Sequence, residues 1–381
     1  MITVCYDGDA LLPGQATTRT GETMTEPRKR DWAEVDRDLE LRWAESRVPG
    51  MTAAIVDGDE VVYTKALGVA SLATGRPVTE RSLFCVASLS KPFVAVAVLQ
   101  LAERGLVNLD APVRDHVPYF HIRGAEGITV RHLLQHTSGL SHGRVFRGDG
   151  RGDDGALERA VRRLTSRRVR SAPGTGYSYS NLGFMVAGDL VSRTSGQPFE
   201  AYVADHILRP LGMNDSTYVP GEAPPDLLTV GHMRTALVVG KPRALKREKL
   251  RRAYAPVGGL YTNVLDLGRW ASVHLHQGQF KEARILTTAS FSLLTRDPVR
   301  LPDGTSVGLG WFLRTMDGPP AFGYVGTTLG YKAHILIDPS RSTAAILLCN
   351  SLLEPTKELF GVVTAAASRG SAPLASRVRG S

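Results

Sequence analysis

Residues 84–93 read FCVASLSKPF, and they run directly into the apolar stretch Phe93–Leu99. This stretch predicts a buried helix, and Ser88 and Lys91, three residues apart at its start, would share one face of it. An ammonium group held beside a hydroxyl in a half-buried cleft loses solvation, so its pKa should fall. A neutral Lys91 could then accept the proton of Ser88. Alone the pattern is weak, because many helices begin with a capping Ser that is followed by a surface Lys.

A second polar motif, YSYSN at residues 177–181, precedes a helical pattern. In an extended segment Tyr179 and Asn181 point to the same side. A phenol close to a lysine could carry a proton to a leaving group. The alternative interpretation is a polar turn in which Asn181 caps the helix that follows.

The pattern of apolar residues changes twice along the chain. An amphipathic helix with Asp31 as its N-cap is expected first, and then a β-hairpin that turns at residues 57–59. From about residue 87 to 278 the signals are mostly helical. Strand patterns return after about residue 305, and a last helix is expected at about 355–367.

This order predicts an α/β (α+β) fold, in which one antiparallel sheet flanked by helices carries an all-helical insertion. We expect a single catalytic domain over residues 29–367. Its α/β part would take about residues 29–86 and 296–367, and its helical lobe about residues 87–295. A functional site is expected at the seam between the two parts.

The two ends of the chain show no periodicity, so residues 1–28 are expected to be a disordered leader and residues 368–381 a flexible tail. No basic segment followed by an apolar one marks a secretion signal, and no apolar run approaches the ~18 residues of a membrane span. The three cysteines are too far apart for a disulfide framework or a paired metal site, which favours a cytoplasmic protein without membrane association. They are Cys5, Cys85 and Cys349.

The net charge of +9 comes from 46 Lys and Arg against 37 Asp and Glu. Most of it lies in two segments, residues 158–170 and 241–252, and the rest of the chain is close to neutral. A chain that binds nucleic acid is therefore not expected. Most such patches are solvated helix faces, and the alternative is that they attract an anionic substrate or partner.

The chain resembles the serine β-lactamase and penicillin-binding-protein-like hydrolases, in particular the branch of class C β-lactamases, D-alanyl-D-alanine carboxypeptidases and family VIII esterases. The resemblance begins with Ser88-x-x-Lys91 and Tyr179-x-Asn181 and spans about residues 31–365. It implies the β-lactamase/transpeptidase-like fold, with catalytic groups at the seam between the sandwich and the helical lobe. The blocks that carry it, in the family's order, are VPGMTAAIVDGDEVVY, FCVASLSKPF, LLQHTSGL, YSYSNLGFMVAGDLV, ILRPLGMNDSTY, PVGGLYTNVLDLGRW and GLGW.

The resemblance also implies a role for each motif residue. Ser88 looks like the acylated nucleophile, and Lys91 looks like its proton partner. Tyr179 is similar to the general base or acid that acts with Lys91. Asn181 looks like a hydrogen-bond partner of Lys91 and of the substrate amide or ester. The oxyanion hole would consist of the backbone N–H groups of Ser88 and Thr327.

The third motif departs from the family, which has Lys-Thr-Gly, His-x-Gly or, in some esterases, Trp-x-Gly where this chain has Tyr324-Val325-Gly326. Gly326 would let the substrate lie along the strand. The missing cation removes a charge-assisted contact worth about 1.5–3 kcal/mol. Tyr324 therefore favours an esterase over a β-lactamase or a carboxypeptidase, unless Lys332 on the same hairpin supplies the charge.

Other candidate sites are weaker. His132 and His136 have ligand spacing, but the sequence lacks the glutamate of H-E-x-x-H, so structural histidines are expected instead of a metal site. The glycine-rich residues 148–155 contain three aspartates and are expected to form a loop that binds no phosphate. Asp266 and Arg269 are expected to lie on the surface or to pack the lobe. The G-x-S-x-G elbow is absent.

The leading hypothesis from the sequence is a serine acyl-enzyme hydrolase that needs no metal or cofactor. Its substrate would be a small ester, amide or acyl donor. The first alternative is an acyltransferase that passes the acyl group from Ser88 to an alcohol or amine. The further alternatives are a D,D-carboxypeptidase or β-lactamase, and a non-catalytic binding relative.

Overall fold

The protein is described by a computed structural model that covers residues 31–143, 153–233, 243–244, 252–316, 318–352 and 356–369. Four regions singled out in the sequence lie wholly or mostly outside these residues. They are the expected leader, most of the expected tail, the first part of the glycine-rich loop and most of the second basic segment.

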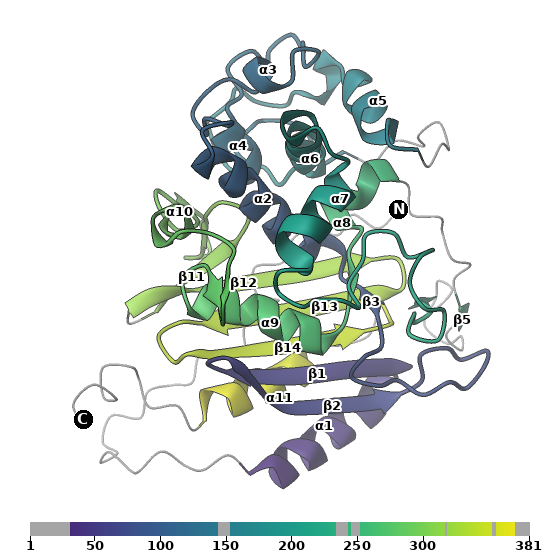
Figure 1. Ribbon diagram of the computed structural model, residues 1–381. Coiled ribbons are helices and arrows are strands. Elements are labelled where there is room, and N and C mark those ends of the chain that lie inside the picture. The colour runs from purple at the N-terminus through teal and green to yellow at the C-terminus, as the bar shows by residue number, and fades with distance from the viewer. Residues whose placement is uncertain are drawn as a thin grey trace.

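An antiparallel sheet forms the centre of the molecule (Figure 1). Among the described residues it has eight strands in the order β2-β1-β14-β13-β12-β11-β10-β9. The expected hairpin at residues 57–59 joins β1 to β2, and the strands expected after residue 305 complete the sheet. The bounds are β1 Gly50–Asp57, β2 Glu60–Gly68, β9 Val299–Arg300, β10 Ser306–Val307, β11 Phe312–Met316, β12 Gly318–Thr328, β13 Tyr331–Asp338 and β14 Thr343–Cys349.

Both faces of the sheet are covered, which explains why β1 reads as a nearly continuous apolar run. Side chains alternate between faces along a strand. Ala53 and Ile55 belong to the core beneath α1 (Trp32–Ser46) and α11 (Thr356–Ser368). Ala54 and Val56, on the opposite face, join the larger core that continues into the helical region.

The helix α9 (Val264–Leu275) lies within the range that the sequence assigned to the helical lobe, but it packs on the sheet against β1, β2 and β14. Ser272 Oγ donates a hydrogen bond to the carbonyl of Gly58, at 3.0 Å, in the β1–β2 turn. A Cβ at Gly268 would lie 2.5 Å from Val61 Cγ2, so the helix approaches the sheet closely. We therefore place α9 with the sheet in the proposed division of the domain.

The remaining helices gather on one side of the sheet, with α2 (Lys91–Glu103) leading from the sheet into the helical region (Figure 1). Asp31 caps α1 as expected. Ser180 caps α6 (Asn181–Ser195), which corrects the alternative interpretation of Asn181. The other helices are α3 Val113–His116, α4 Val130–Leu134, α5 Ala156–Arg162, α7 Phe199–Val203, α8 Ala255–Gly258, α10 Thr288–Ser292, the 3-10 helices η2 Ala87–Ser90, η3 Ser166–Arg168 and η5 Arg252–Tyr254, and the π-helix η4 Ala204–Leu208.

Three two-stranded ladders complete the described structure: β3 (Phe84–Cys85) with β6 (Tyr261–Thr262), β4 (His232–Met233) with β5 (Arg243–Ala244), and β7 (Gln279–Phe280) with β8 (Ala283–Arg284). No helix in the described part of the chain has the length and apolar character to cross a bilayer. Cys85 and Cys349 are buried free thiols.

Candidate active site

The turn that carries Ser88 is a short 3-10 helix, η2, and Lys91 begins the α-helix that follows it. A 3-10 helix has three residues per turn, so side chains three apart lie directly above one another. Lys91 Nζ donates a hydrogen bond to Ser88 Oγ at 3.0 Å. Ala87, just before Ser88, has a φ of 48°, a left-handed conformation that is costly for a residue with a Cβ. The surrounding contacts must hold this turn in place.

The ammonium nitrogen of Lys91 is completely buried, whereas Ser88 is half-buried and reachable from solvent. Lys91 Nζ also donates to the carbonyl of Val257 at 2.9 Å. Burial lowers the pKa of Lys91, and the neighbouring Tyr179 acts in the opposite direction. The pair therefore combines an accessible hydroxyl with an amine that gives up its proton more easily than a free lysine.

Tyr179 makes the second hydrogen bond to Ser88, because its OH donates to Ser88 Oγ at 3.0 Å. Lys91 Nζ lies 5.1 Å from the centre of the Tyr179 ring. The ring stacks on His136 at 4.3 Å between centroids and lies 5.4 Å from the ring of His142. The three residues that the sequence placed at the centre of the site thus meet around one oxygen atom.

The backbone behind Ser88 is held by the segment that runs from α8 into β6. Val86 N–H donates to the carbonyl of Leu260 at 2.9 Å, and Leu260 N–H donates to Ser90 Oγ at 3.1 Å. Together with the ladder between β3 and β6, these bonds fix the nucleophile turn on both sides. The same segment supplies the carbonyl of Val257 to Lys91.

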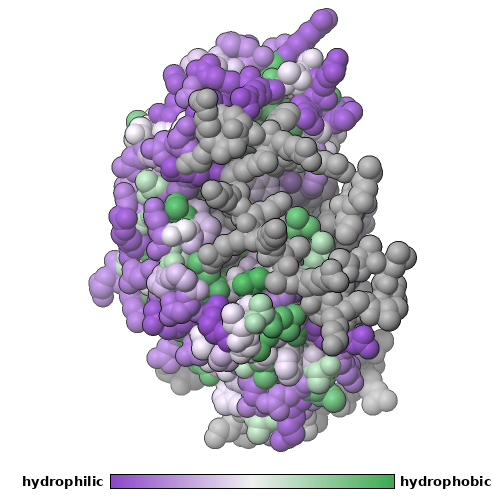
Figure 2. All heavy atoms as spheres, turned by 90° about the vertical axis from the view of Figure 1, so that its right-hand side faces the viewer, coloured by the Kyte–Doolittle hydropathy of each residue, from purple (hydrophilic) through white to green (hydrophobic). Residues whose placement is uncertain are grey.

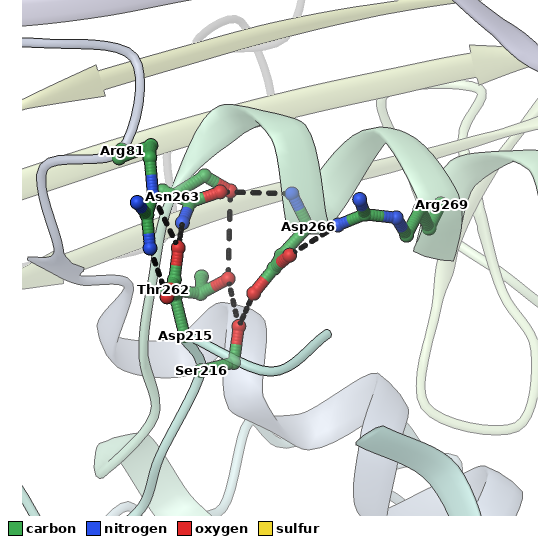
Figure 3. Close-up of polar contacts among 7 residues, drawn as sticks. All are labelled: Arg81, Asp215, Ser216, Thr262, Asn263, Asp266 and Arg269. Carbon is green, nitrogen blue, oxygen red and sulfur yellow. Dashed lines mark hydrogen bonds and ion pairs between the residues drawn. The ribbon is translucent and has the colours of Figure 1, made fainter. Parts of the chain in front are cut away.

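A polar network that reaches from the surface to the buried Thr262 and Asp266 lies beside β6 (Figure 3). Ser216 Oγ lies 2.7 Å from Thr262 Oγ1 and donates to Asp266 Oδ2 at 2.7 Å. Asp266 also accepts from Arg269 at 2.5 Å. The sequence expected Asp266 and Arg269 on the surface or in lobe packing, and the structure buries Asp266 in this network. The network is completed by Arg81, Asp215 and Asn263.

Gly326 marks the place where the sheet meets the nucleophile turn. A Cβ at this position would lie 1.9 Å from the carbonyl oxygen of Val86 and 3.2 Å from the backbone nitrogen of Leu89. No side chain fits there, which gives the glycine of the third motif a steric reason. Thr327, the second proposed oxyanion donor, follows Gly326 directly on β12.

The other members of the third motif occupy defined positions on the sheet. Tyr324 is 1% exposed and packs against Trp311 and Phe312 at 6.1 and 5.3 Å. Lys332 pairs directly with Thr327 and with Cys349, whose side chain belongs to the core under α1 and α11. Directly paired residues share a face of the sheet. Lys332 therefore lies on the face opposite Gly326, and the expectation that it could replace the missing cation is wrong.

Asn181 enters the site from the first turn of α6 and is 7% exposed. Its Nδ2 lies 3.4 Å from His142 Nε2, and its Oδ1 is buried with no hydrogen-bond partner among the described residues. The expected hydrogen bond to Lys91 is not formed here, because Lys91 Nζ is directed to Ser88 and to the carbonyl of Val257.

Two histidines near Tyr179 were missed as site residues by the sequence reasoning. His136 lies beyond the end of α4 with a φ of 57°, so it does not share a helix face with His132. Its Nδ1 accepts the backbone N–H of Ser180 at 3.0 Å. Burial first, and then the charge of Lys91, lower the pKa of His136 well below 6.5, so the ring is neutral. Only the place of His136 in the LLQHTSGL block could have indicated that it belongs to the site. No sequence pattern marked His142 as a site residue.

No group of three or more His, Cys, Asp or Glu side chains within the described ranges is arranged to hold a metal ion. The first basic segment forms α5 and η3, and Arg159 and Arg162 pair with Asp153 and Glu158 at 2.7 and 2.6 Å. The part of the molecule that contains α5 is covered mainly by hydrophilic residues on the side shown in Figure 2. These pairs are typical of a solvated helix face.

Comparisons with known proteins identify the family of this chain. The family model described as Beta-lactamase matches residues 35–366. Penicillin-binding protein 4 of Amycolatopsis lactamdurans is 32% identical over 80% of this chain and 82% of its own length. Esterase EstB of Burkholderia gladioli is 40% identical over 50% of this chain and 52% of its own. The octameric penicillin-binding protein homologue from Pyrococcus abyssi, 24% identical, has a similar fold, with a TM-score of 0.74 over 92% of this chain and 81% of that one.

Proposed function

This chain belongs to the Beta-lactamase family of serine hydrolases, and from that premise we propose that it hydrolyses small ester substrates through an acyl-enzyme on Ser88. One observation carries the proposal: Ser88 Oγ lies 3.0 Å from both Lys91 Nζ and Tyr179 OH. The hydroxyl is reachable, and the amine beside it is buried with a lowered pKa. That is the arrangement of an activated nucleophile.

In the proposed acylation step, neutral Lys91 keeps one N–H on the carbonyl of Val257 and offers its lone pair to Ser88. Ser88 Oγ bonds to the substrate carbonyl carbon as its proton passes to Lys91. The electron pair of the C=O bond moves to oxygen, where the backbone N–H groups of Ser88 and Thr327 would stabilise it. The carbon–oxygen bond to the alcohol then breaks, and the alcohol leaves with a proton that Tyr179 donates and regains from Lys91.

Deacylation reverses these roles with water as the nucleophile. Water gives one proton to Lys91 through Tyr179, and the water oxygen bonds to the acyl carbon. The bond to Ser88 Oγ breaks, Ser88 recovers a proton, and the free acid leaves. An alcohol or amine in place of water would give the acyltransferase reaction, which shares the first half of the cycle.

An ester is favoured as the substrate class because the third motif offers no cation for a substrate carboxylate. Tyr324 is buried among aromatic rings, and Lys332 lies on the opposite face of the sheet. The similarity to an esterase over half of the chain points the same way.

The test uses the purified full-length chain with p-nitrophenyl esters of several acyl lengths and a fluorophosphonate probe. We expect turnover, together with one probe molecule per chain on the peptide that contains Ser88. Ser88→Ala should lose both, with kcat/KM reduced by a factor on the order of 10⁴–10⁶. Ser166→Ala, an exposed serine in η3, is the matched control and should behave like the wild type.

Three outcomes would contradict the proposal or its preferred substrate class. Ester turnover that survives in Ser88→Ala would exclude Ser88 as the nucleophile. Acyl products formed with added alcohols or amines in preference to the free acid would identify an acyltransferase. Efficient nitrocefin turnover would show that the missing third-motif cation does not exclude β-lactams.

A further inference from the structure

His142 stands out among the residues around the site, because it touches Asn181 twice and the proposed chemistry does not use it. The carbonyl of His142 accepts the backbone N–H of Asn181 at 3.2 Å, and the side-chain atoms Nε2 and Nδ2 lie 3.4 Å apart. One residue earlier, the carbonyl of Ser141 accepts Ser180 Oγ at 3.0 Å. Residues 141–142 thus hold the start of α6 by its backbone and by its side chains.

The atoms in this contact decide the protonation state of the ring. An amide Nδ2 is only a donor, and an imidazole nitrogen accepts only when it carries no proton. With the amide oriented as in the structure, the contact fits neutral His142 with its proton on Nδ1. His142 is exposed at the surface, yet the partial desolvation of its ring and then the charge of Lys91 lower its pKa, which favours this neutral form.

The same contact determines which end of the Asn181 side-chain amide faces the interior. With Nδ2 held by His142, the oxygen Oδ1 is the free end of the amide. It is buried and accepts no hydrogen bond from any described residue. A buried oxygen left as an acceptor is costly unless a donor arrives during function. Asn181 is therefore prepared to receive a donor on the side away from His142.

We propose that neutral His142 is a positioning residue, which holds the Asn181 amide with Nδ2 outward and Oδ1 inward as a hydrogen-bond acceptor for the acylation cycle. The inference rests on the proposed function of Ser88 and deepens it. When Lys91 takes up the proton of Ser88 it gains a third N–H, and an inward acceptor stabilises the cation so formed.

Protonation of His142 would reverse this arrangement. Its Nε2–H would then face the Nδ2 donor, so the amide would turn over and present Nδ2 to the interior. The titratable groups that face His142 are Lys91 from α2, Tyr179 from the segment before α6 and, beyond the Tyr179 ring, His136. Lys91 and His136 carry no negative charge, so neither opposes the neutral form of His142.

The contact itself can be tested without catalysis. Histidine labelled with ¹³C at Cε1 gives one NMR signal per ring, and His142→Gln assigns the signal of His142. Removing the donor in Asn181→Ala should raise the pKa of His142 by about half a pH unit to one unit, since the neutral ring loses a hydrogen bond. An unchanged or lower pKa in Asn181→Ala would overturn the proposal.

Kinetics separate positioning from a merely structural role. We expect His142→Ala to lower kcat for a p-nitrophenyl ester by about tenfold with little change in KM. His142→Gln should recover most of the wild-type kcat, because the glutamine side-chain oxygen can accept from Asn181 Nδ2. Since glutamine does not titrate, the pH profile of kcat should also lose the fall at acidic pH that protonation of His142 causes. In the Asn181→Ala variant, adding His142→Ala should not lower kcat any further. His121→Ala, at an exposed histidine, is the matched control.

The outcomes distinguish this inference from the proposed function. If the wild type fails to turn over any ester, the proposed function fails while the NMR titration still decides the contact. If the wild type is active and His142→Ala matches it, or if the effects of His142→Ala and Asn181→Ala add in full, His142 does not position Asn181.

Discussion

Tyr179 OH donates a hydrogen bond of 3.0 Å to Ser88 Oγ across 91 residues of sequence. The two residues belong to segments that contact each other because α2 and α6 pack together in the helical region. The phenol is therefore one of two donors, with Lys91 Nζ, that lie 3.0 Å from Ser88 Oγ.

Replacing Tyr179 with phenylalanine tests its hydroxyl with little change in packing. Tyr179→Phe keeps the ring between His136 and His142 but removes the proton carrier, so kcat for ester hydrolysis should fall by about 10²–10⁴-fold. Tyr177→Phe is a matched control, because the Tyr177 hydroxyl is buried and bonds to no described residue. A Tyr179→Phe enzyme with wild-type kcat would remove Tyr179 from the proton path.

Lys91→Arg keeps a positive charge and removes the base, since a guanidinium cannot lose its proton in a protein. We expect kcat/KM to fall by about 10²–10⁴-fold. In the wild type, kcat/KM should rise with pH through the pKa of Lys91, which burial places below the ordinary 10.5. Stopped assays across the pH range would show this limb. The exposed Lys281→Arg serves as the control, and a pH-independent rate would contradict the role of Lys91.

Gly326→Ala should damage both stability and catalysis. The added methyl group would collide with the carbonyl of Val86, and overpacking of this kind costs about 1–3 kcal/mol. If the strand moves away from the turn, Thr327 N–H moves with it, and kcat should fall by about 10²–10³-fold. Urea unfolding and ester kinetics measure the two effects. Gly361→Ala in α11, where a Cβ meets nothing within 4 Å, should leave both unchanged or add slightly to stability.

Asp189 in α6 predicts a pH dependence of stability. Burial raises its pKa to about 6, although Tyr119 OH donates to it at 2.6 Å and acts in the opposite direction. The folded protein then binds this proton more tightly than the unfolded chain does. This contribution to the free energy of unfolding is therefore complete below about pH 4, declines up to about pH 6, and is absent above it.

A pKa difference of about two units corresponds to about 3 kcal/mol at most. In Asp189→Asn, the free energy of unfolding measured with urea should no longer decline between pH 4.5 and pH 7. The exposed Asp226→Asn should keep the wild-type profile. A decline of equal size in wild type and Asp189→Asn would place its origin elsewhere.

The main elements of the fold followed from local patterns. Asp31, the turn at residues 57–59 and the strands after residue 305 appear as expected, because caps, turns and strand alternation depend on near neighbours. The position of α9 did not follow. Its apolar face fits a sheet as well as a helical bundle, and only tertiary contacts such as Gly268 against Val61 and Ser272 with Gly58 decide between them.

The site divides in a similar way. The i, i+3 spacing of Ser88 and Lys91 and the resemblance to the family predicted the central residues. Lys332 was placed wrongly, because a hairpin in the sequence does not say which face each side chain takes until the strand register is known. His142 could not be found, since its role depends on a contact 39 residues away.

The close approach at Gly326 has a consequence for redesigning the enzyme. At this point the backbone of β12 lies against the backbone of the turn that carries Ser88, so the contact does not depend on any rotamer. Side chains near this contact, including the exposed Leu329 of the β12–β13 turn, can then be varied without disturbing it. We expect libraries that spare residue 326 to keep many active variants, among which substrate range can be selected.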